Sequence, residues 1–278
     1  MNMFEKSITA ICACKNRNAA LNISLRSWLN FDQISEIIIV DWSSDESLEY
    51  LTKWDNRIKI VSVPNRKYFN QPQPLNLAAM LSTSKYILKM DCDYILNPYF
   101  SFFENENYFI DDQSFVCGQN TTDRGFDPYY KYLFGFLYIS KDNFMKVNGF
   151  SEKFRKWYAS EDQDIMIRLQ NYGLKNRGID YDHNIIHIPH PDNKRTENFE
   201  ASDSEKHCRD EIKEVLKNNG FENQELEWQT DFCLAQSHIN MNYEWISNMG
   251  KNYIYADPMT EWKVEEVCPQ FYIAKENE

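Results

Sequence analysis

The sequence predicts an α/β protein with a mainly parallel central sheet flanked by helices. Short runs of β-branched residues alternate with segments of helical spacing through the first third of the chain. Acidic residues directly follow two of these runs. The chain has 278 residues, of which 42% are hydrophobic, so it is long enough to bury a substantial core.

Four compact apolar runs are the expected strands, at residues 8–14, 37–40, 58–63 and 86–90. Apolar residues recur at helical spacing between them, in segments 21–29, 47–51 and 75–81. Because strand and helix alternate, we expect the strands to be parallel, with their carboxyl ends at one edge of the sheet. Ligands of such sheets bind beyond that edge.

The sequence turns polar from about Asp192, which indicates a linker. We therefore expect a catalytic domain in residues 1–200 and a small C-terminal extension in residues 201–278. The extension is rich in aromatic and turn residues. It could be an acceptor platform, a partner surface or a small subdomain packed on the catalytic core.

Composition and charge limit the class of protein. The net charge of −12 leaves no basic footprint for nucleic acid. Seven scattered cysteines without a C-x-x-C pair favour a reducing compartment over a disulfide framework. The segment before the first strand is short for a signal peptide, and the longest apolar run, residues 129–139, is too short to span a bilayer. We expect a cytoplasmic protein, or one bound peripherally at the inner membrane face.

A candidate metal site follows the fourth predicted strand. Asp91 and Asp93 are two positions apart, so their side chains share one face, and two such carboxylates favour a cation between them. Oxygen ligands suit Mg²⁺ or Mn²⁺, and the histidines His187 and His190 shift the expectation toward Mn²⁺. Taken alone, the acidic pair would by default be a solvated turn, and the histidines would be one surface residue and one buried, hydrogen-bonded residue. In an acidic protein a metal would also offset the charge of a bound diphosphate.

A candidate general base lies at a predicted helix start. The S-x-x-Q pattern of residues 160–163 is a capping box. It places Glu161 and Asp162 on the first helical turn, where the helix dipole favours ionised carboxylates that can accept a hydroxyl proton. The alternative is that both residues only stabilise the helix start. One turn on, Asp164 can pair with Arg168.

These residues are part of longer patterns that resemble known glycosyltransferases. Five motifs of this chain resemble the β-1,4-galactosyltransferase family. They are Y-L-F-G at 132–135, N-G-F at 148–150, E-D-x-D at 161–164, F-N-(x)4-L-N at 69–76 and K-N-R at 15–17. D-W-S-S-D at 41–45 resembles the nucleotide-contacting loop of bacterial family-2 glycosyltransferases. The resemblance covers roughly residues 7–198 and several independent motifs. It implies the GT-A fold, a Rossmann-like fold of nucleotide-diphospho-sugar transferases.

The resemblance also implies a role for each matching residue. Asp162 would be the catalytic base, and Glu161 would hold the acceptor. The metal ligands would be Asp93, His190 and His187. The donor-binding residues would be Lys15, Arg17, Asp41, Phe69, Asn76, Asp91, Tyr132 and Gly135. Tyr132 matches an aromatic residue that crowds C2 of the donor sugar, which goes with galactose rather than N-acetylgalactosamine.

The implied activity is inverting, metal-dependent transfer of a hexose from a UDP-sugar. The hexose would be either galactose or an N-acetylhexosamine. The acceptor would be a carbohydrate or a lipid-linked oligosaccharide in bacterial surface polysaccharide synthesis, with Mn²⁺ or Mg²⁺ as cofactor. Two departures leave the acceptor and the sugar open. The family's W-G-G reads Tyr158-Ala159-Ser160 here, and its donor-site Gly-Gly reads Phe134-Gly135. The sequence does not indicate an oligomeric state.

Three other classes of protein fit the sequence less well. A retaining transferase resembling the polypeptide N-acetylgalactosaminyltransferases would carry Glu-Asn where this chain has Glu161-Asp162. A sugar nucleotidyltransferase would need a glycine-rich loop after the first strand, whereas residues 13–18 contain no glycine. A non-catalytic carbohydrate- or nucleotide-binding module would not need metal ligands and a helix-start aspartate together.

Overall fold

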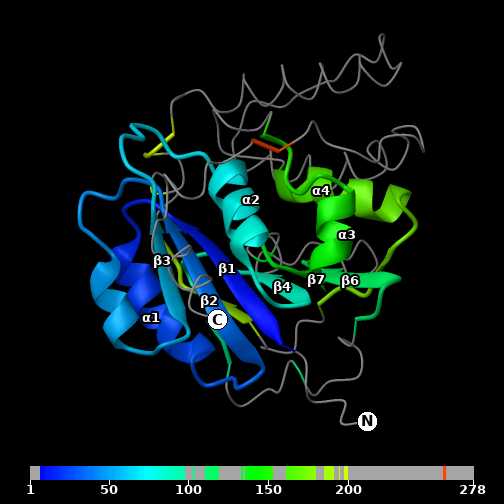
Figure 1. Cartoon of the computed structure of the whole chain (residues 1–278), viewed down its shortest axis with the longest axis horizontal. Coiled ribbons are helices and arrows are strands. Elements are labelled where there is room, and N and C mark those ends of the chain that lie inside the picture. Colours follow the sequence, from blue (N-terminus) through cyan, green and yellow to red (C-terminus); the bar gives the residue numbers. More distant parts are fainter. Residues whose placement is uncertain are drawn as a thin grey trace, which may run out of the picture.

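The computed structural model describes residues 7–97, 103, 110–118, 133, 135–152, 161–179, 185–190, 194, 197–199 and 259–260. Within this part of the chain, a seven-stranded sheet has the order β3-β2-β1-β4-β7-β6-β8 (Figure 1). A second, two-stranded sheet pairs β5 with β9.

The strands of the main sheet are β1 (Ile8–Cys14), β2 (Ile34–Asp41), β3 (Ile58–Ser62), β4 (Tyr86–Lys89), β6 (Ser114–Cys117), β7 (Leu137–Ser140) and β8 (Lys175–Asn176). The small sheet consists of β5 (Tyr94–Leu96) and β9 (Ile185–His187). The helices are α1 (Asn18–Trp28), α2 (Pro72–Leu81), α3 (Lys141–Lys146), α4 (Glu161–Asn171) and the 3₁₀ helix η1 (Glu49–Lys53).

The predicted α/β class is confirmed. β1 pairs in parallel with β2 and β4, and β2 pairs in parallel with β3, as the alternation of strands and helices predicts. β7 then inserts between β4 and β6 and is antiparallel to both. The sheet is therefore mainly parallel on its N-terminal side and mixed beyond β4.

The helix expected at residues 47–51 is shorter than a full α-helix. Only the 3₁₀ helix η1 forms, and Leu51 is its buried residue. The hydroxyl of Thr52 donates to the carbonyl of Glu49 at 2.8 Å. Such local side-chain bonds compete with helical ones, and one buried apolar residue gives the segment little packing to extend it.

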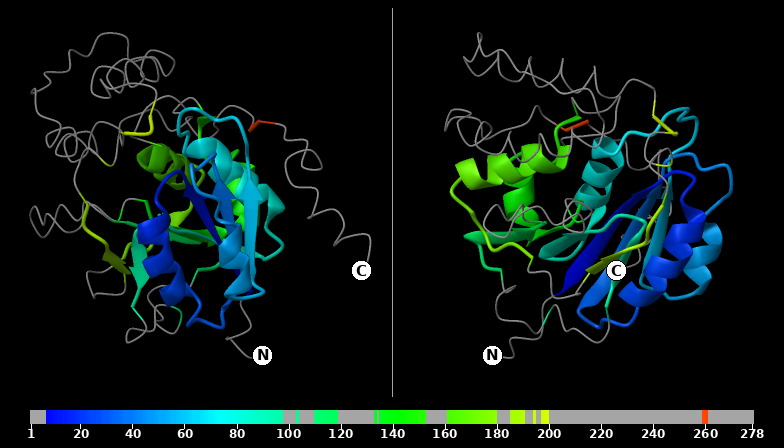
Figure 2. Two further views of the ribbon diagram at one scale, coloured as in Figure 1. Left: turned by 90° about the vertical axis from the view of Figure 1, so that its left-hand side faces the viewer. Right: turned by 180° about the vertical axis from the view of Figure 1, so that it is seen from behind.

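Each face of the sheet buries its own core (Figure 2). Alternate strand residues point to opposite faces, so Ile37 and Ile39 of β2 pack with α1, whereas Ile38 and Val40 pack on the α2 side. The α1 core also takes in residues of η1, β5 and β9. The opposite core is covered by α2, α3 and α4.

The division into residues 1–200 and 201–278 stays a prediction, because only residues 259–260 of the C-terminal extension are described. There, Thr260 donates its backbone N–H to Glu152 Oε1 at 3.0 Å, and its hydroxyl accepts from Gln73 Nε2 at 2.9 Å. In the described part of the chain no helix is long and apolar enough to cross a membrane. The cysteines described there, Cys12, Cys14, Cys92 and Cys117, are free thiols.

Candidate active site

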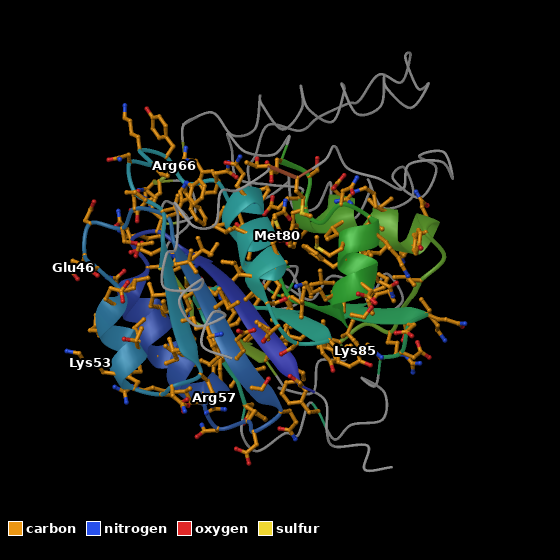
Figure 3. All side chains as sticks on the ribbon, viewed as in Figure 1. Glu46, Lys53, Arg57, Arg66, Met80 and Lys85 are labelled. Atoms are coloured by element: carbon orange, nitrogen blue, oxygen red, sulfur yellow. The ribbon has the colours of Figure 1, made fainter. Side chains whose placement is uncertain are left out.

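The carboxyl ends of β1, β2 and β4 meet at one edge of the sheet. Figure 3 marks this edge by Arg66, which follows β3, and the opposite edge by Arg57 and Lys85, which precede β3 and β4. Asp41 ends β2, and Asp91 and Asp93 follow β4. The prediction that acidic residues of separate strands share this edge therefore matches the topology.

The loop after β1 is tied to the loop after β2. Lys15 Nζ donates to the carbonyls of Trp42 at 3.2 Å, Ser43 at 2.7 Å and Arg66 at 2.9 Å. Asp41 Oδ1 accepts the backbone N–H of Ser44 at 2.9 Å. Lys15 and Asp41, both predicted to serve the nucleotide, thus shape the rim of the site by holding its loops in place.

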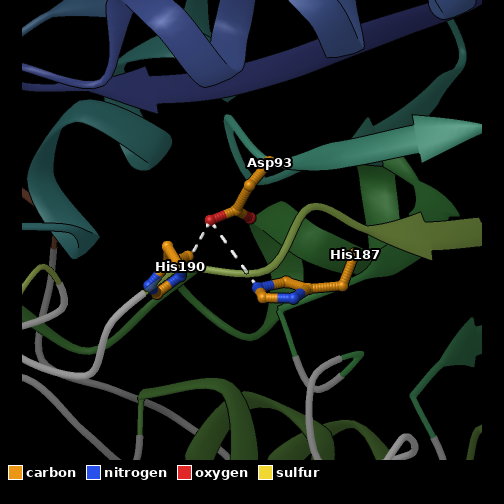
Figure 4. A group of neighbouring side chains, drawn as sticks. All are labelled: Asp93, His187 and His190. Carbon is orange, nitrogen blue, oxygen red and sulfur yellow. Dashed lines mark ion pairs between the residues drawn. The ribbon is translucent and has the colours of Figure 1, made fainter.

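A candidate metal centre lies beside the small sheet. Asp93, His187 and His190 have ligand atoms that all lie within 4.8 Å of one another. Asp93 Oδ2 lies 3.2 Å from His190 Nε2 and 3.7 Å from His187 Nε2 (Figure 4). The backbone N–H of Ile188 donates to the carbonyl of Asp93 at 2.8 Å, which fixes the histidine loop against the end of β4. The three predicted metal ligands are therefore together.

Arg17 faces the same carboxylate. Its Nη2 lies 3.1 Å from Asp93 Oδ2, and its side chain is 21% exposed. Asp93 is thus surrounded by an arginine and two imidazoles. Burial raises the pKa of Asp93, but the hydrogen bond from His190 and the charges of His187 and Arg17 outweigh it, so the pKa is lowered. An ionised carboxylate is the form that binds a cation.

Asp91 has the opposite balance. Its pKa is raised, because burial and the charge of Asp93 outweigh the stabilising ammonium of Lys89. The backbone of Gly135 lies directly against this carboxyl group. A Cβ atom at Gly135 would lie 2.0 Å from Asp91 Oδ2, so a larger residue there would displace the Asp91 side chain. The predicted donor-site residues Asp91 and Gly135 are therefore in contact.

Lys89 joins the two acidic segments of the site. Its side chain is fully buried, and Nζ lies 2.9 Å from Asp91 Oδ1 and 3.2 Å from Asp162 Oδ1. Burial lowers the pKa of Lys89, but the charges of Asp162 and Asp91 more than offset this and raise it, so the ammonium stays charged. The ion pair brings the start of α4 to the end of β4.

Glu161 and Asp162 begin α4, as the capping pattern predicts, although the cap side chains themselves lie outside the described residues. Burial and the charge of Asp162 raise the pKa of Glu161 to about 8. Burial also raises the pKa of Asp162, to about 6, with Lys89 opposing the rise. Near pH 7 the pair therefore holds one proton, mainly on Glu161, and Asp162 is the carboxylate.

Three predicted donor residues need separate mention. Asn76 is fully buried and exchanges two hydrogen bonds of 2.9 Å with the backbone of Phe150, so its amide joins α2 to the turn after α3. Phe69 packs edge to face on Phe199 with ring centroids 5.4 Å apart. Tyr132 lies outside the described residues.

Sequence reasoning missed two residues of the site, Lys89 and Gln71. Gln71 precedes α2 and its Nε2 lies 3.5 Å from Asp91 Oδ1. The available signal for Lys89 was a charged residue at the end of an otherwise apolar strand, two positions before the acidic pair. For Gln71 it was the position inside the F-N-(x)4-L-N pattern.

Comparison with known proteins agrees with this geometry. The glycosyl transferase family 2 profile matches residues 9–155, more than half of the chain. A profile described as the N-terminal domain of galactosyltransferase matches residues 120–191. A comparison with curated protein sequences gives no significant match.

Solved structures share the fold at low sequence identity. S. aureus TarS 1-349 in complex with UDP-GlcNAc is 15% identical with a TM-score of 0.58, covering 90% of this chain and 73% of that one. Another structure of the same fragment matches with a TM-score of 0.51 and 15% identity over 64% of this chain. In that comparison the chain spans only 59% of the length of the TarS fragment. A weaker similarity, with a TM-score of 0.47 and 14% identity, is to a Drosophila β-1,4-galactosyltransferase 7 mutant with manganese, UDP-Gal and xylobiose, over 73% of this chain and 79% of that one.

The fold is GT-A, with a mainly parallel sheet, and the family whose profile matches is one of glycosyltransferases. The expectation drawn from the sequence resemblance is confirmed for both. The chain belongs to glycosyl transferase family 2.

Proposed function

We propose that this protein is an inverting, Mn²⁺-dependent hexosyltransferase that moves galactose or an N-acetylhexosamine from a UDP-sugar to a carbohydrate acceptor. The observation that carries the proposal is the ion pair of Lys89 with Asp91 and Asp162. It puts the candidate base at the start of α4 next to the acidic segment that also carries Asp93. The solved TarS structures hold UDP and UDP-GlcNAc, which makes UDP-sugars the first donors to test.

The proposed metal ligands fit Mn²⁺ by their chemistry. Asp93 offers a carboxylate oxygen, and His187 and His190 offer imidazole nitrogens, a mixed donor set that suits Mn²⁺ better than Mg²⁺. A bound divalent ion would offset the charge of the diphosphate and stabilise UDP as a leaving group. Arg17 lies beside the same carboxylate and would be near the diphosphate, with its charge already balanced by Asp93.

The proposed roles of the two α4 carboxyl groups follow from their different protonation. Asp162 is ionised near neutral pH, so one of its Oδ atoms can take the proton from the acceptor hydroxyl as the new glycosidic bond forms. Glu161 holds its proton up to about pH 8 and can donate a hydrogen bond to the acceptor. Separate environments that push two carboxyl pKa values apart are a common basis for distinct roles.

A retaining mechanism is the alternative to test. Inverting transfer needs a base on the face of the sugar opposite the departing UDP, and a helix-start aspartate that is ionised at neutral pH supports that assignment.

The proposal further includes a lipid-linked oligosaccharide acceptor in bacterial surface polysaccharide synthesis, with the enzyme working in the cytoplasm. A panel of free sugars and polyprenyl-linked oligosaccharides tests the acceptor class.

The experiment is a screen of UDP-sugars with Mn²⁺, measuring UDP release first without and then with acceptors. The product of the best pair is then analysed by NMR. We expect release from a UDP-hexose only with divalent metal, and a β-linked product from the α-configured donor. An α-linked product would contradict inversion, and full activity in excess chelator would contradict metal dependence.

A further inference from the structure

Lys89 is a buried charge at the end of a core strand. It is the last residue of β4, and the other residues of this strand, Tyr86, Ile87 and Leu88, are buried as well. A charge that is removed from water is tolerated only when it is paired. Lys89 meets this condition through two carboxylates that belong to different parts of the fold, Asp91 and Asp162.

The two carboxylates depend on Lys89 to different degrees. Asp91 also accepts hydrogen bonds from the Tyr94 hydroxyl and from Gln71 Nε2, the latter at 3.5 Å. For the Asp162 side chain, Lys89 is the polar partner that the described part of the chain provides, with Nζ at 3.2 Å. Removing the ammonium would therefore release Asp162 more than Asp91.

We propose that Lys89 is a positioning residue for sugar transfer, which fixes the Asp162 carboxylate beside the donor-side acidic segment and keeps it in the charged form. The inference rests on the proposed function, because it assumes that Asp162 is the base. Lys89 itself is enclosed and need not touch either substrate. Its effect would be transmitted through the orientation and ionisation of Asp162.

The charged and titratable groups around Asp162 support this role. Among the described residues they are Lys89 from β4, Asp91 after β4, Glu161 on α4 itself and Cys117 from β6. Burial raises the pKa of the Cys117 thiol, so this group stays neutral. Burial and Asp91 both raise the pKa of Asp162, and Lys89 is the group that lowers it. Without Lys89, burial and the charge of Asp91 would both oppose ionisation of Asp162.

The test compares Lys89→Met with Lys59→Met in the full chain. Lys59 is a control of the same residue type with a buried carboxylate partner, because its Nζ pairs with Glu36 at 2.6 Å in the same sheet but away from the site, and its own side chain is 40% exposed. For Lys89→Met we expect kcat to fall at least about 10-fold, the KM for the UDP-sugar to change less, and the acid limb of the pH–rate profile to move up by about one unit. Lys59→Met should keep the wild-type kcat and profile.

A double variant keeps the inference testable if Lys89→Met folds poorly. Lys89→Met with Asp162→Asn removes both charges, so it leaves less uncompensated charge in the core. If Lys89 acts through Asp162, the double variant should be no slower than Asp162→Asn alone. Independent, additive losses would overturn the inference, as would a folded Lys89→Met variant with wild-type kcat and profile.

The outcomes separate the two proposals. Loss of transfer in Asp162→Asn together with normal kinetics of Lys89→Met would reject only the role of Lys89. Full transfer by Asp162→Asn, or no UDP-sugar turnover by the wild-type protein, would reject the proposed function itself.

Discussion

Four carboxyl groups in two short segments, Asp91 with Asp93 and Glu161 with Asp162, differ in how their pKa values are shifted. Burial raises the pKa of each, and the neighbouring charges then decide the net direction. Imidazoles and Arg17 keep Asp93 ionised, whereas for Glu161 burial and two nearby aspartates outweigh the charge of Lys89 and a backbone hydrogen bond. The site therefore combines two ionised carboxylates, which we propose as metal ligand and base, with a protonated acid.

The pH dependence of transfer is the first consequence. We expect kcat/KM to fall as the pH drops below about 6, because a proton on Asp162 removes the base. The measurement is a pH–rate profile at saturating Mn²⁺, with Mn²⁺ binding followed by EPR at each pH, since protonated histidines would also release the metal. A rate that stays flat well below pH 6 while metal remains bound would argue against Asp162 as the base.

Glu161 gives a separate prediction about stability. Its pKa is about 8 in the folded protein against an ordinary 4.5, so the unfolded chain loses this proton at lower pH than the folded protein. Folding stability should therefore decline as the pH rises from about 4.5 to about 8. Glu161→Gln removes this decline and should gain several kcal/mol over wild type near pH 8, because each pH unit between the two pKa values is worth about 1.4 kcal/mol.

Thermal unfolding at several pH values checks this, with Glu46→Gln, at an exposed position, as the control. The gain of Glu161→Gln over wild type should widen toward pH 8, whereas the control should show no such trend. A gain that is constant with pH would mean that Glu161 is not a buried acid with a raised pKa.

How far single residues could be predicted depends on what their neighbours do. Asp93, His187 and His190 were predictable because a strand end and a loop carry the residue types that bind metal. Asn76 has a residue type that fits a donor site, but its amide binds the backbone of Phe150, and only tertiary packing decides between the two. Lys89 was missed because a lysine at the end of a strand is usually solvated.

At the level of elements, α4 is fixed to the turn after α3 by one buried arginine. Arg168 is fully buried, and its Nη1 and Nη2 donate to the carbonyls of Val147 at 2.6 Å and Gly149 at 2.7 Å. Nη2 also pairs with Asp164 Oδ2 at 2.6 Å, as the sequence spacing predicts. The orientation of α4, and with it the position of Asp162, depends on this anchor.

Asp164→Asn should therefore destabilise the fold, although Asp164 lies only two residues from the proposed base. Neutralising one partner leaves the Arg168 charge buried without its counter-ion, which costs about 3 kcal/mol. Asp142→Asn, at an exposed first-turn position of α3, should cost less than about 1 kcal/mol. Urea unfolding compares them, and equal stability of the two variants would show that the anchor contributes little.

At the level of the whole molecule, the net charge of −12 has to be reconciled with an anionic donor. Lys15 is engaged by three carbonyls and Lys89 by two carboxylates, while Arg17 faces Asp93. These basic groups are already used inside the protein. A divalent ion is therefore a simple additional source of positive charge for the diphosphate.

We therefore expect UDP to bind at least about 10-fold more weakly in excess chelator than with Mn²⁺. Isothermal titration of UDP under both conditions measures this without any turnover. The variant Asp93→Asn should bind UDP equally weakly with and without Mn²⁺. Tight UDP binding by the wild-type protein in chelator would show that the chain neutralises the diphosphate by itself.

The overall architecture was predictable on its N-terminal side and less so beyond it. β1 to β4 are apolar runs separated by helices, and that alternation permits few arrangements other than a parallel sheet. The insertion of β7 between β4 and β6 was not predicted, because antiparallel pairing between distant segments leaves little trace in local sequence.

The most direct test of the central claim is the transfer rate of Asp162→Asn at a temperature where it is as well folded as wild type. Asn keeps the size of the side chain, and the proposed metal ligands are elsewhere, so UDP and Mn²⁺ binding should persist. Loss of a general base should lower transfer about 10²–10⁴-fold, whereas Asp142→Asn should be unaffected. If Asp162→Asn bound UDP and Mn²⁺ and still transferred sugar at near the wild-type rate, Asp162 would not be the base.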